Sequence, residues 1–117
     1  MTVTVDDCVF CKIVAGDLPA EVLGRGERAL AIRDLHPQAP FHALVIPFDH
    51  HENAAASAAA DPAALGHLVL LAGEVAREAG HDDYRLVANT GAGAGQTVFH
   101  THLHVLAGTT RMTESLV

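Results

Sequence analysis

The chain has 117 residues, of which 50% are hydrophobic and 18% are charged, so we expect one compact domain over residues 1–117. The 7 basic and 14 acidic residues give a formal charge of −7, which argues against a protein that binds long nucleic acid. No apolar run approaches the roughly 18 residues of a membrane-spanning helix, because polar residues interrupt the most apolar stretch, at 65–79.

The first half of the chain predicts a short N-terminal helix followed by three strands. The helix or turn covers Cys8–Ala15 and is ended by Gly16. A break that contains Gly26 separates the first two apolar runs, which is typical of a β-hairpin. Two prolines make residues 35–40 a loop. We expect the strands at residues 20–25, 28–34 and 41–47, and an irregular connection over 49–57.

The second half predicts one long helix followed by two strands. Asp61 is a good N-cap, Pro62 suits the first helical position, and Gly80 is a natural terminator. Apolar residues at the helical period form the expected buried stripe: Leu65, Leu68, Val69, Ala72, Val75, Ala76 and Ala79. The strands are expected over 84–89 and 98–106, with a glycine-rich loop over 90–96. This order indicates an α+β domain with an antiparallel sheet.

Two cysteines, Cys8 and Cys11, lie three residues apart near the N-terminus. The segment before them has neither the basic nor the apolar region of a secretory signal, so we expect a cytoplasmic protein with reduced thiols. In that compartment the Cys-x-x-Cys spacing is more typical of a metal knuckle or a redox pair than of a structural disulfide.

Histidine is unusually frequent, with 9 residues in the chain. The last predicted strand carries His100, His102 and His104, which project from one face because side chains alternate along a strand. The opposite face carries the residues expected to anchor the strand in the core: Phe99, Thr101, Leu103 and Val105. Three interpretations of the histidine row compete, namely a solvated face, a metal cluster, and phosphoryl chemistry in which an imidazole attacks phosphorus.

The segment before this strand favours phosphoryl chemistry. Residues 89–97 read Asn-Thr-Gly-Ala-Gly-Ala-Gly-Gln-Thr, and glycines let backbone N–H groups approach an anion closely. The segment is not a P-loop, because no Gly-Lys-Ser/Thr follows. It is not a dinucleotide fingerprint either, because Gln96 replaces the third glycine and a strand follows.

Residues 100–107, His-Thr-His-Leu-His-Val-Leu-Ala, resemble the motif of the histidine triad (HIT) family, His-φ-His-φ-His-φ-φ, in which φ is hydrophobic and Thr101 is a departure. Residues 8–19, 34–42, 45–47, 89 and 95–99 also match, so the resemblance covers nearly the whole chain in order. It is closest to the Hint branch of nucleotide-binding phosphoramidases. It implies the HIT-like α+β fold: a five-stranded antiparallel sheet with one long helix and a short N-terminal helix, in a homodimer.

The resemblance also implies a reaction, the hydrolysis of purine nucleoside phosphoramidates through a covalent nucleotidyl-histidine intermediate, with no metal required for the chemistry. His102 would be the nucleophile at the α-phosphate, and the main-chain carbonyl of His100 would hold its Nδ1 proton. His42 and His104 would contact the phosphate. The nucleotide-binding residues would be Asp34 at the ribose, Leu35 at the base, and Asn89, Gly95, Gln96 and Thr97 around the phosphate or the leaving group.

Some bacterial members of this family carry structural zinc on two cysteines and two histidines. The matching residues here are Cys8, Cys11, His50 and His100. Such an ion would stiffen the segment beside the nucleophile and would add stability rather than catalysis. The alternative is a pair of reduced thiols that pack in the N-terminal turn, and His51 competes with its neighbour for the place of a ligand.

The C-terminus departs from the family pattern, because the chain has no Trp. In the Hint branch a Trp-Pro-rich tail often reaches the site of the partner subunit and touches the leaving group there. The preferred leaving group and base therefore stay open. Within the same fold, the alternatives are a dinucleoside polyphosphate hydrolase and a zinc-stabilised nucleotide-binding adaptor with little turnover. A catalytic metallohydrolase that uses the strand histidines as ligands is disfavoured, because Asp and Glu are absent from residues 84–113.

Overall fold

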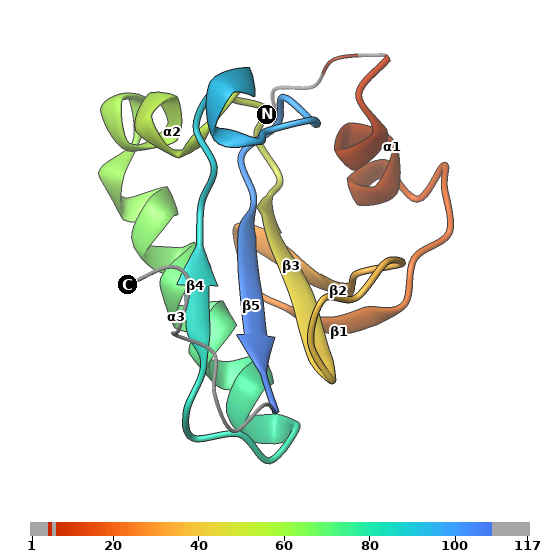
Figure 1. The fold of residues 1–117 in the computed structure, drawn as a ribbon. Helices are drawn as coiled ribbons and strands as arrows, with labels where there is room; N and C mark the ends of the chain where they lie inside the picture. Colours follow the sequence, from red (N-terminus) through yellow and green to blue (C-terminus); the bar gives the residue numbers. More distant parts are fainter. Residues whose placement is uncertain (1–4, 6, 109–117) are drawn as a thin grey trace.

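Five antiparallel strands form one sheet in the order β1-β2-β3-β5-β4, with helices on both of its faces (Figure 1). The computed structural model describes residues 5 and 7–108. Its elements in chain order are α1 Val9–Ala15, β1 Val22–Arg25, β2 Ala29–Arg33, β3 Phe41–Pro47, α2 Ala54–Ala60, α3 Pro62–Glu78, β4 Arg85–Val87, a short 3-10 helix Ala92–Ala94 and β5 Leu103–Ala107. The expected α+β fold with a five-stranded antiparallel sheet is confirmed.

Local sequence signals set the ends of the N-terminal elements. The Cys8 side chain caps α1 by accepting a hydrogen bond from the Cys11 N–H, and Gly16 ends the helix with a φ of 84°. That left-handed conformation favours glycine, because a side chain would clash with the backbone. The predicted β1–β2 hairpin is confirmed, and the Gly26 N–H closes its turn on the Ala29 carbonyl.

Helix α2 is a feature that the sequence analysis missed, because residues 49–57 were expected to be an irregular connection. Asn53 caps the helix through its side chain, which accepts from the Ala56 N–H at 2.9 Å. Six of the seven residues that follow are alanine, the residue with the highest helix propensity. Asp61 then ends α2 and caps α3, where an ion pair with Arg28 also holds it.

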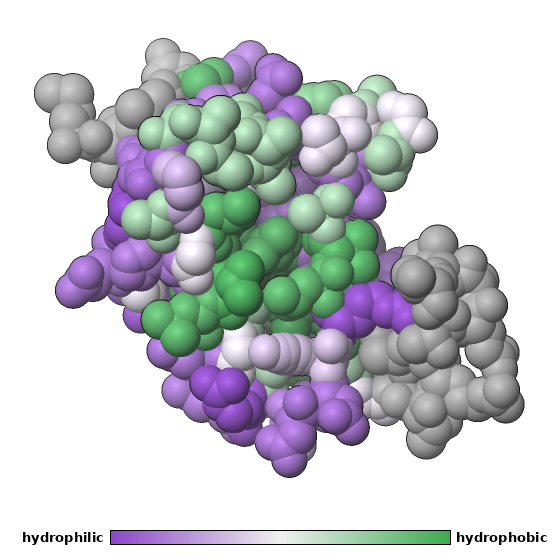
Figure 2. All heavy atoms as spheres, turned by 90° about the vertical axis from the view of Figure 1, so that its left-hand side faces the viewer, coloured by the Kyte–Doolittle hydropathy of each residue, from purple (hydrophilic) through white to green (hydrophobic). Residues whose placement is uncertain are grey.

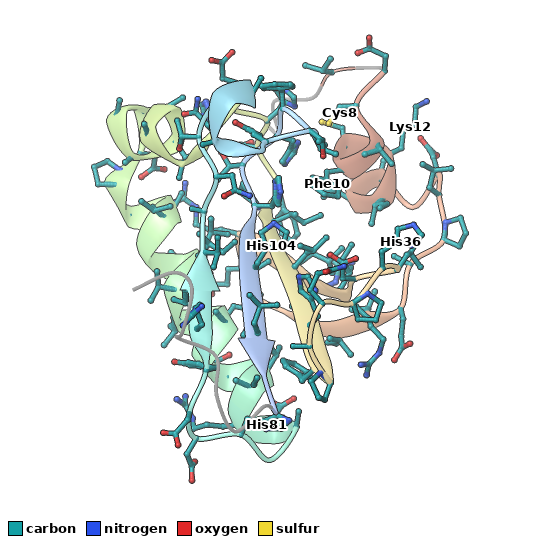
Figure 3. The ribbon with its side chains drawn as sticks, in the orientation of Figure 1. Cys8, Phe10, Lys12, His36, His81 and His104 are labelled. Atoms are coloured by element: carbon teal, nitrogen blue, oxygen red, sulfur yellow. The ribbon has the colours of Figure 1, made fainter. Side chains whose placement is uncertain are left out.

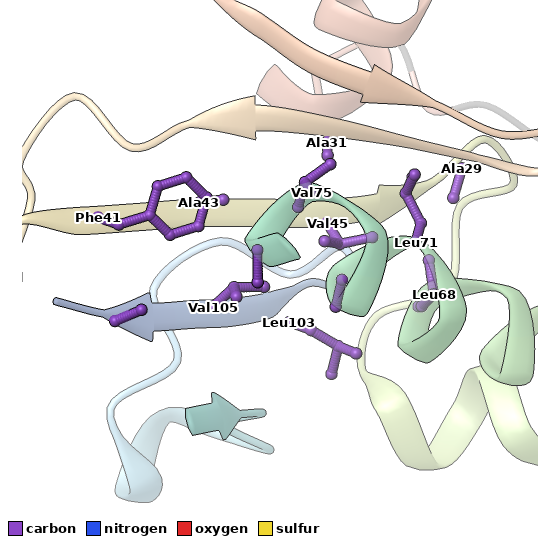
Figure 4. Packing of buried hydrophobic residues seen from close by; sticks show 13 residues of the cluster. Ala29, Ala31, Phe41, Ala43, Val45, Leu68, Leu71, Val75, Leu103 and Val105 are labelled. Carbon is purple, nitrogen blue, oxygen red and sulfur yellow. The ribbon is translucent and has the colours of Figure 1, made fainter. Parts of the chain in front are cut away.

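The larger hydrophobic core lies between α3 and one face of the sheet (Figure 4). It contains Leu68, Leu71 and Val75 from the helix, packed against alternate residues of the strands such as Val45 and Val105. The predicted stripe was wrong at Val69, which is 48% exposed, and at the exposed Ala79, whereas the unpredicted Leu71 is buried. The buried face of α3 is therefore rotated by part of a turn from the stripe that the 3.6-residue period alone suggested.

The opposite face of the sheet is covered by α1 (Figure 1). Phe10, Cys8 and Cys11 pack there against alternate residues of β2 and β3, including Leu30 and Ile46. None of the described helices is long and apolar enough to cross a membrane. The sheet thus has one face that packs mainly against α3 and another face that combines packing with the histidine and cysteine side chains.

Strand β5 begins at Leu103 and not at residue 98, so His100 and His102 precede the strand. The pairing with β3 stops at Val45–Leu103, because Pro47 has no N–H to donate and its carbonyl is 3.0 Å from the His100 Nε2. The prediction that Phe99 anchors the strand was also wrong, because Phe99 is 47% exposed. Thr101, Leu103 and Val105 are buried as expected.

Candidate active site and metal cluster

Three imidazoles meet on the α1 side of the sheet, where β3 and β5 lie next to each other. His42 comes from β3, His104 from β5, and His102 from the residues that lead into β5. The ring centroids of His102 and His104 are 5.1 Å apart, as are those of His42 and His104. Figure 3 shows Phe10 extending from α1 above this part of the sheet, while His81 lies at the far end of the molecule.

The backbone determines which nitrogen of His102 carries its proton. The Nδ1 atom lies 2.8 Å from the main-chain carbonyl oxygen of His100, and a carbonyl can only accept, so Nδ1 must donate. The lone pair of the neutral ring is therefore on Nε2. The ring of Phe10 packs edge-on against His102, with centroids 5.1 Å apart and planes at 71°, which limits the rotation of the imidazole.

A second backbone group determines the tautomers of His42 and His104. The Gln38 main-chain N–H donates to the Nδ1 of His42 at 3.0 Å, so the proton of neutral His42 is on Nε2. That Nε2 is 2.9 Å from the Nδ1 of His104 and 3.3 Å from the Asp34 carboxylate. His104 therefore accepts at Nδ1 and carries its own proton on Nε2. The resulting chain of hydrogen bonds runs from Gln38 through both rings.

Burial favours the neutral forms of His104 and His42 near pH 7. It lowers the pKa of His104 to about 4, and the charges of His102 and His42 add to the effect. Burial also lowers the pKa of His42, against the opposing charge of Asp34. Neutral rings with defined tautomers can donate and accept in fixed directions, which is what proton transfer and phosphate contact require.

The loop after β2 places Asp34, the predicted ribose residue, beside His42. Asp34 accepts a hydrogen bond from the His36 N–H at 2.7 Å through one carboxylate oxygen, and its other oxygen faces His42. Leu35 is 85% exposed. So much exposed apolar surface leaves the Leu35 side chain accessible to a ligand.

The glycine-rich loop is held by the side chain of Gln96, which is 3% exposed. Its amide oxygen accepts from the Gly91 N–H at 2.8 Å, and its amide nitrogen donates to the carbonyls of Glu52 and Val98. The side chain of Gln96 thus orders the loop from within rather than pointing out of it. Asn89 is half-buried at the loop's beginning, whereas Gly95 and Thr97 are exposed at its end.

A second cluster brings together the four residues predicted to bind zinc. Cys8, Cys11, His50 and His100 each have a ligand atom within 4.8 Å of the others. The two Nδ1 atoms are 3.1 Å apart. The His100 Nδ1 lies 3.3 Å from the Cys8 sulfur and 3.5 Å from the Cys11 sulfur, and the His50 Nδ1 lies 3.4 Å from the Cys11 sulfur. Ligand atoms around a tetrahedral zinc lie about 3.3 to 3.8 Å from one another, so the Cys2His2 group could hold such an ion.

The tautomer of His100 suits a metal ligand. Its Nε2 donates to the Pro47 carbonyl at 3.0 Å, which leaves the lone pair on Nδ1, the atom that faces the thiols. Burial lowers the pKa of His100 to about 4 and also lowers the pKa of His50, so both rings are neutral at pH 7. Burial raises the pKa of the Cys11 thiol, and a bound cation would reverse that effect.

Asp34, His42 and His104 are also close enough to surround a cation, but their hydrogen bonds do not suit one. Binding at the Nε2 of His42 would move its proton to Nδ1, where it would face the Gln38 N–H donor at 3.0 Å. Two N–H groups cannot share that space without losing the hydrogen bond. This trio is therefore better suited to proton transfer than to metal binding.

Several groups at the site were not found from the sequence. Phe10 contacts both His100 and His102, and the Gln38 N–H and the Pro47 carbonyl set tautomers. The two backbone groups have no side-chain signature, whereas the aromatic residue between the two cysteines could have been noted. The residues after Gly108, where the sequence departs from the family pattern, lie outside the described residues.

Comparisons with known proteins identify the family of this chain. The family model named HIT domain matches residues 15–111. An uncharacterized HIT-like protein of Synechocystis is 46% identical over 104 residues, which cover 88% of this chain and 91% of the relative. A solved HIT family hydrolase from Clostridium thermocellum has a TM-score of 0.91 and 39% identity, covering 97% of this chain and 100% of that one. A histidine triad protein from Clostridium difficile has a TM-score of 0.88 and 34% identity, covering 93% and 96%. The chain therefore belongs to the HIT domain family.

Proposed function

We propose that this protein is a hydrolase that cleaves the P–N bond of purine nucleoside phosphoramidates through a nucleotidyl-His102 intermediate. The observation that carries the proposal is the hydrogen bond from His102 Nδ1 to the His100 carbonyl, which leaves Nε2 as a nucleophile. The similar protein from Clostridium thermocellum is described as a HIT family hydrolase, which supports the reaction class. The purine and the amine are expectations from the family resemblance.

In the first step, the Nε2 lone pair of His102 attacks the α-phosphorus, the bond to the leaving nitrogen breaks, and the amine takes up a proton from solvent. The His102 ring becomes positively charged, and the His100 carbonyl stabilises that charge through the Nδ1 proton. The Nε2–H of His104 donates to a phosphate oxygen, oriented by its hydrogen bond to His42. Water then forms a bond to phosphorus while the bond from phosphorus to Nε2 breaks, and one proton of the water is released to solvent. This step yields a nucleoside monophosphate and regenerates neutral His102.

The nucleotide would lie between the loop after β2 and the glycine-rich loop. Asp34 would accept hydrogen bonds from the ribose hydroxyls, and the exposed Leu35 would cover the base. Gly95 and Thr97, at the end of the loop that Gln96 orders, would donate to the phosphate or the leaving group. In this proposal Asn89 lies at the other end of the same loop and would contact the same groups.

Zinc would be held by Cys8, Cys11, His50 and His100, and its contribution would be structural. The ion would tie α1 to the segments after β3 and before β5, because its four ligands come from those three parts of the chain. None of the proposed bond-forming steps involves it.

The test of the reaction is a brief incubation of the full chain with an adenylyl phosphoramidate, followed by mass spectrometry. We expect a mass increase of one nucleotidyl group on the peptide that contains residues 100–104, and no such increase in His102→Ala. The variant His67→Ala, on α3 at the opposite face of the sheet from the three imidazoles, is the matched control and should keep the adduct. Turnover by His102→Ala at the wild-type rate would exclude the covalent route.

Rates on other substrates separate the remaining functions. A dinucleoside polyphosphate that is hydrolysed much faster than any phosphoramidate would favour the second hydrolase. Tight binding of a nucleoside monophosphate with negligible turnover of both substrates would favour the adaptor.

We also propose that the protein is a homodimer in which β4 pairs with β4 of a second copy. Strand β4 lies at an edge of the sheet, and an unpaired edge is a template for another strand. Hydrophobic residues gather on the side of the molecule formed by α3 and β4 (Figure 2). Val69 of α3 and Leu86 of β4 are 48% and 37% exposed. Light scattering should give twice the monomer mass, and Leu86→Arg should halve it. Val22→Arg, at the other edge of the sheet, should not change the mass.

A further inference from the structure

Two buried hydroxyl groups meet behind the candidate nucleophile. Ser57 of α2 is 3% exposed and Thr101 is fully buried, and their oxygens are 2.5 Å apart. Threonine stands here at a position where the HIT motif has a hydrophobic residue. A buried hydroxyl costs free energy unless it is hydrogen-bonded, so the pair satisfies a requirement that a hydrophobic residue would not create.

The protons of this pair have defined directions. The Thr101 hydroxyl is 3.2 Å from the His51 carbonyl oxygen, which can only accept, so Thr101 donates its single proton there. Ser57 must then be the donor to Thr101. A chain of hydrogen bonds therefore runs from α2 through Thr101 to the backbone at His51, the residue that follows the candidate zinc ligand His50.

The peptide group between His100 and Thr101 is held at both of its polar atoms. Its N–H donates to the His51 carbonyl at 2.8 Å, and its C=O accepts from the Nδ1 of His102, also at 2.8 Å. A peptide group is planar, so whatever holds the N–H also aims the C=O. The Thr101 hydroxyl adds a second bond to the same His51 carbonyl and prevents this plane from tilting.

We propose that Ser57 and Thr101 are positioning residues for His102, because their hydroxyl pair keeps the His100 carbonyl aimed at the Nδ1 proton of the nucleophile. Neither side chain touches the substrate. They act through one peptide plane, which selects the tautomer that leaves Nε2 unprotonated. The inference rests on the proposed function for its kinetic consequences, but its structural consequence at His102 does not depend on any substrate.

The test separates the hydroxyl of Thr101 from its methyl group. Thr101→Val keeps the shape and removes the hydroxyl, whereas Thr101→Ser keeps the hydroxyl and removes the methyl. With an adenylyl phosphoramidate, we expect kcat to fall about tenfold in Thr101→Val with little change in KM, because a misaligned nucleophile slows the chemical step more than binding. Thr101→Ser should keep a kcat near the wild-type value. Ser57→Ala, on another element, should lower kcat about threefold.

The second measurement is the proton NMR signal of the His102 Nδ1–H in the full chain. Hydrogen-bonded to a carbonyl, this proton should be visible in the wild type and in Thr101→Ser, and broadened by exchange in Thr101→Val. This signal remains a test of the inference even if the wild type turns over no phosphoramidate, an outcome that would refute the proposed function alone. Equal signals in all variants would overturn the inference, as would an equal loss in Thr101→Ser and Thr101→Val.

Discussion

His104 should make the stability of this fold depend on pH, because its ring is neutral in the folded protein. Burial lowers the pKa of His104 from 6.5 to about 4, whereas the unfolded chain keeps the ordinary value. Between these two values the unfolded state binds more protons than the folded state. Stability is therefore fully present above about pH 6.5, falls as the pH drops toward 4, and changes no further below that for this group.

The size of the effect follows from the two pKa values. At pH 5 the unfolded imidazole is almost wholly protonated and the folded one is almost wholly neutral. The difference in free energy of unfolding between pH 7.5 and pH 5 is then about 2 kcal/mol for this one group. His42 and the histidines of the metal cluster add to the total, because burial lowers their pKa values as well.

Urea denaturation of the wild type and of His104→Gln at both pH values isolates this contribution. Glutamine offers an oxygen that can accept from the His42 Nε2–H, so the other histidines keep their surroundings. We expect the variant to lose about 2 kcal/mol less than the wild type on going from pH 7.5 to pH 5. The same loss in both proteins would refute the reasoning, because it would mean that the ring takes up its proton equally well when folded.

Three further predictions concern the metal cluster, the hydrogen-bond chain and the core. Zinc should bind at one ion per chain by native mass spectrometry and raise the melting temperature, and Cys11→Ser should abolish both effects; an unchanged shift would exclude this cluster. Gln38→Pro removes the N–H that orients His42, so kcat should fall about tenfold with little change in nucleotide affinity; a wild-type kcat would show that this tautomer is unimportant. Leu68→Ala should cost about 3 kcal/mol in chemical denaturation, because Leu68 is fully buried, whereas Leu70→Ala at a 57% exposed position should cost under about 1 kcal/mol; equal costs would contradict the burial argument.

The sequence predicted the fold well where each signal was local. The hairpin with Gly26, the cap at Asp61 and the termination at Gly80 all depend on residues adjacent to the feature they define. The start of β5 was missed because it depends on Pro47, which is distant in the sequence and withholds the N–H that would have extended the ladder. The face of α3 was misplaced at Val69 because the direction of burial depends on how the helix crosses the sheet.

The candidate site was predicted as a set of residue types but not as a network. A row of histidines and the family motif pointed to His102 and His104, and their spacing could be read from the chain. The direction of each proton could not be read in this way, because the acceptors and donors are main-chain groups of His100, Gln38 and Pro47. Every residue type has such groups, so no sequence pattern marks them.

The alternation along β5 has a consequence for how this protein can change over evolution. Val105 belongs to the core beneath α3, and His104 beside it belongs to the site on the other face. An insertion or deletion of one residue within Leu103–Ala107 would exchange the two sets of side chains across the sheet. Insertions and deletions should therefore accumulate in the loops of the lineage, while this strand keeps its length even where its individual hydrophobic residues vary.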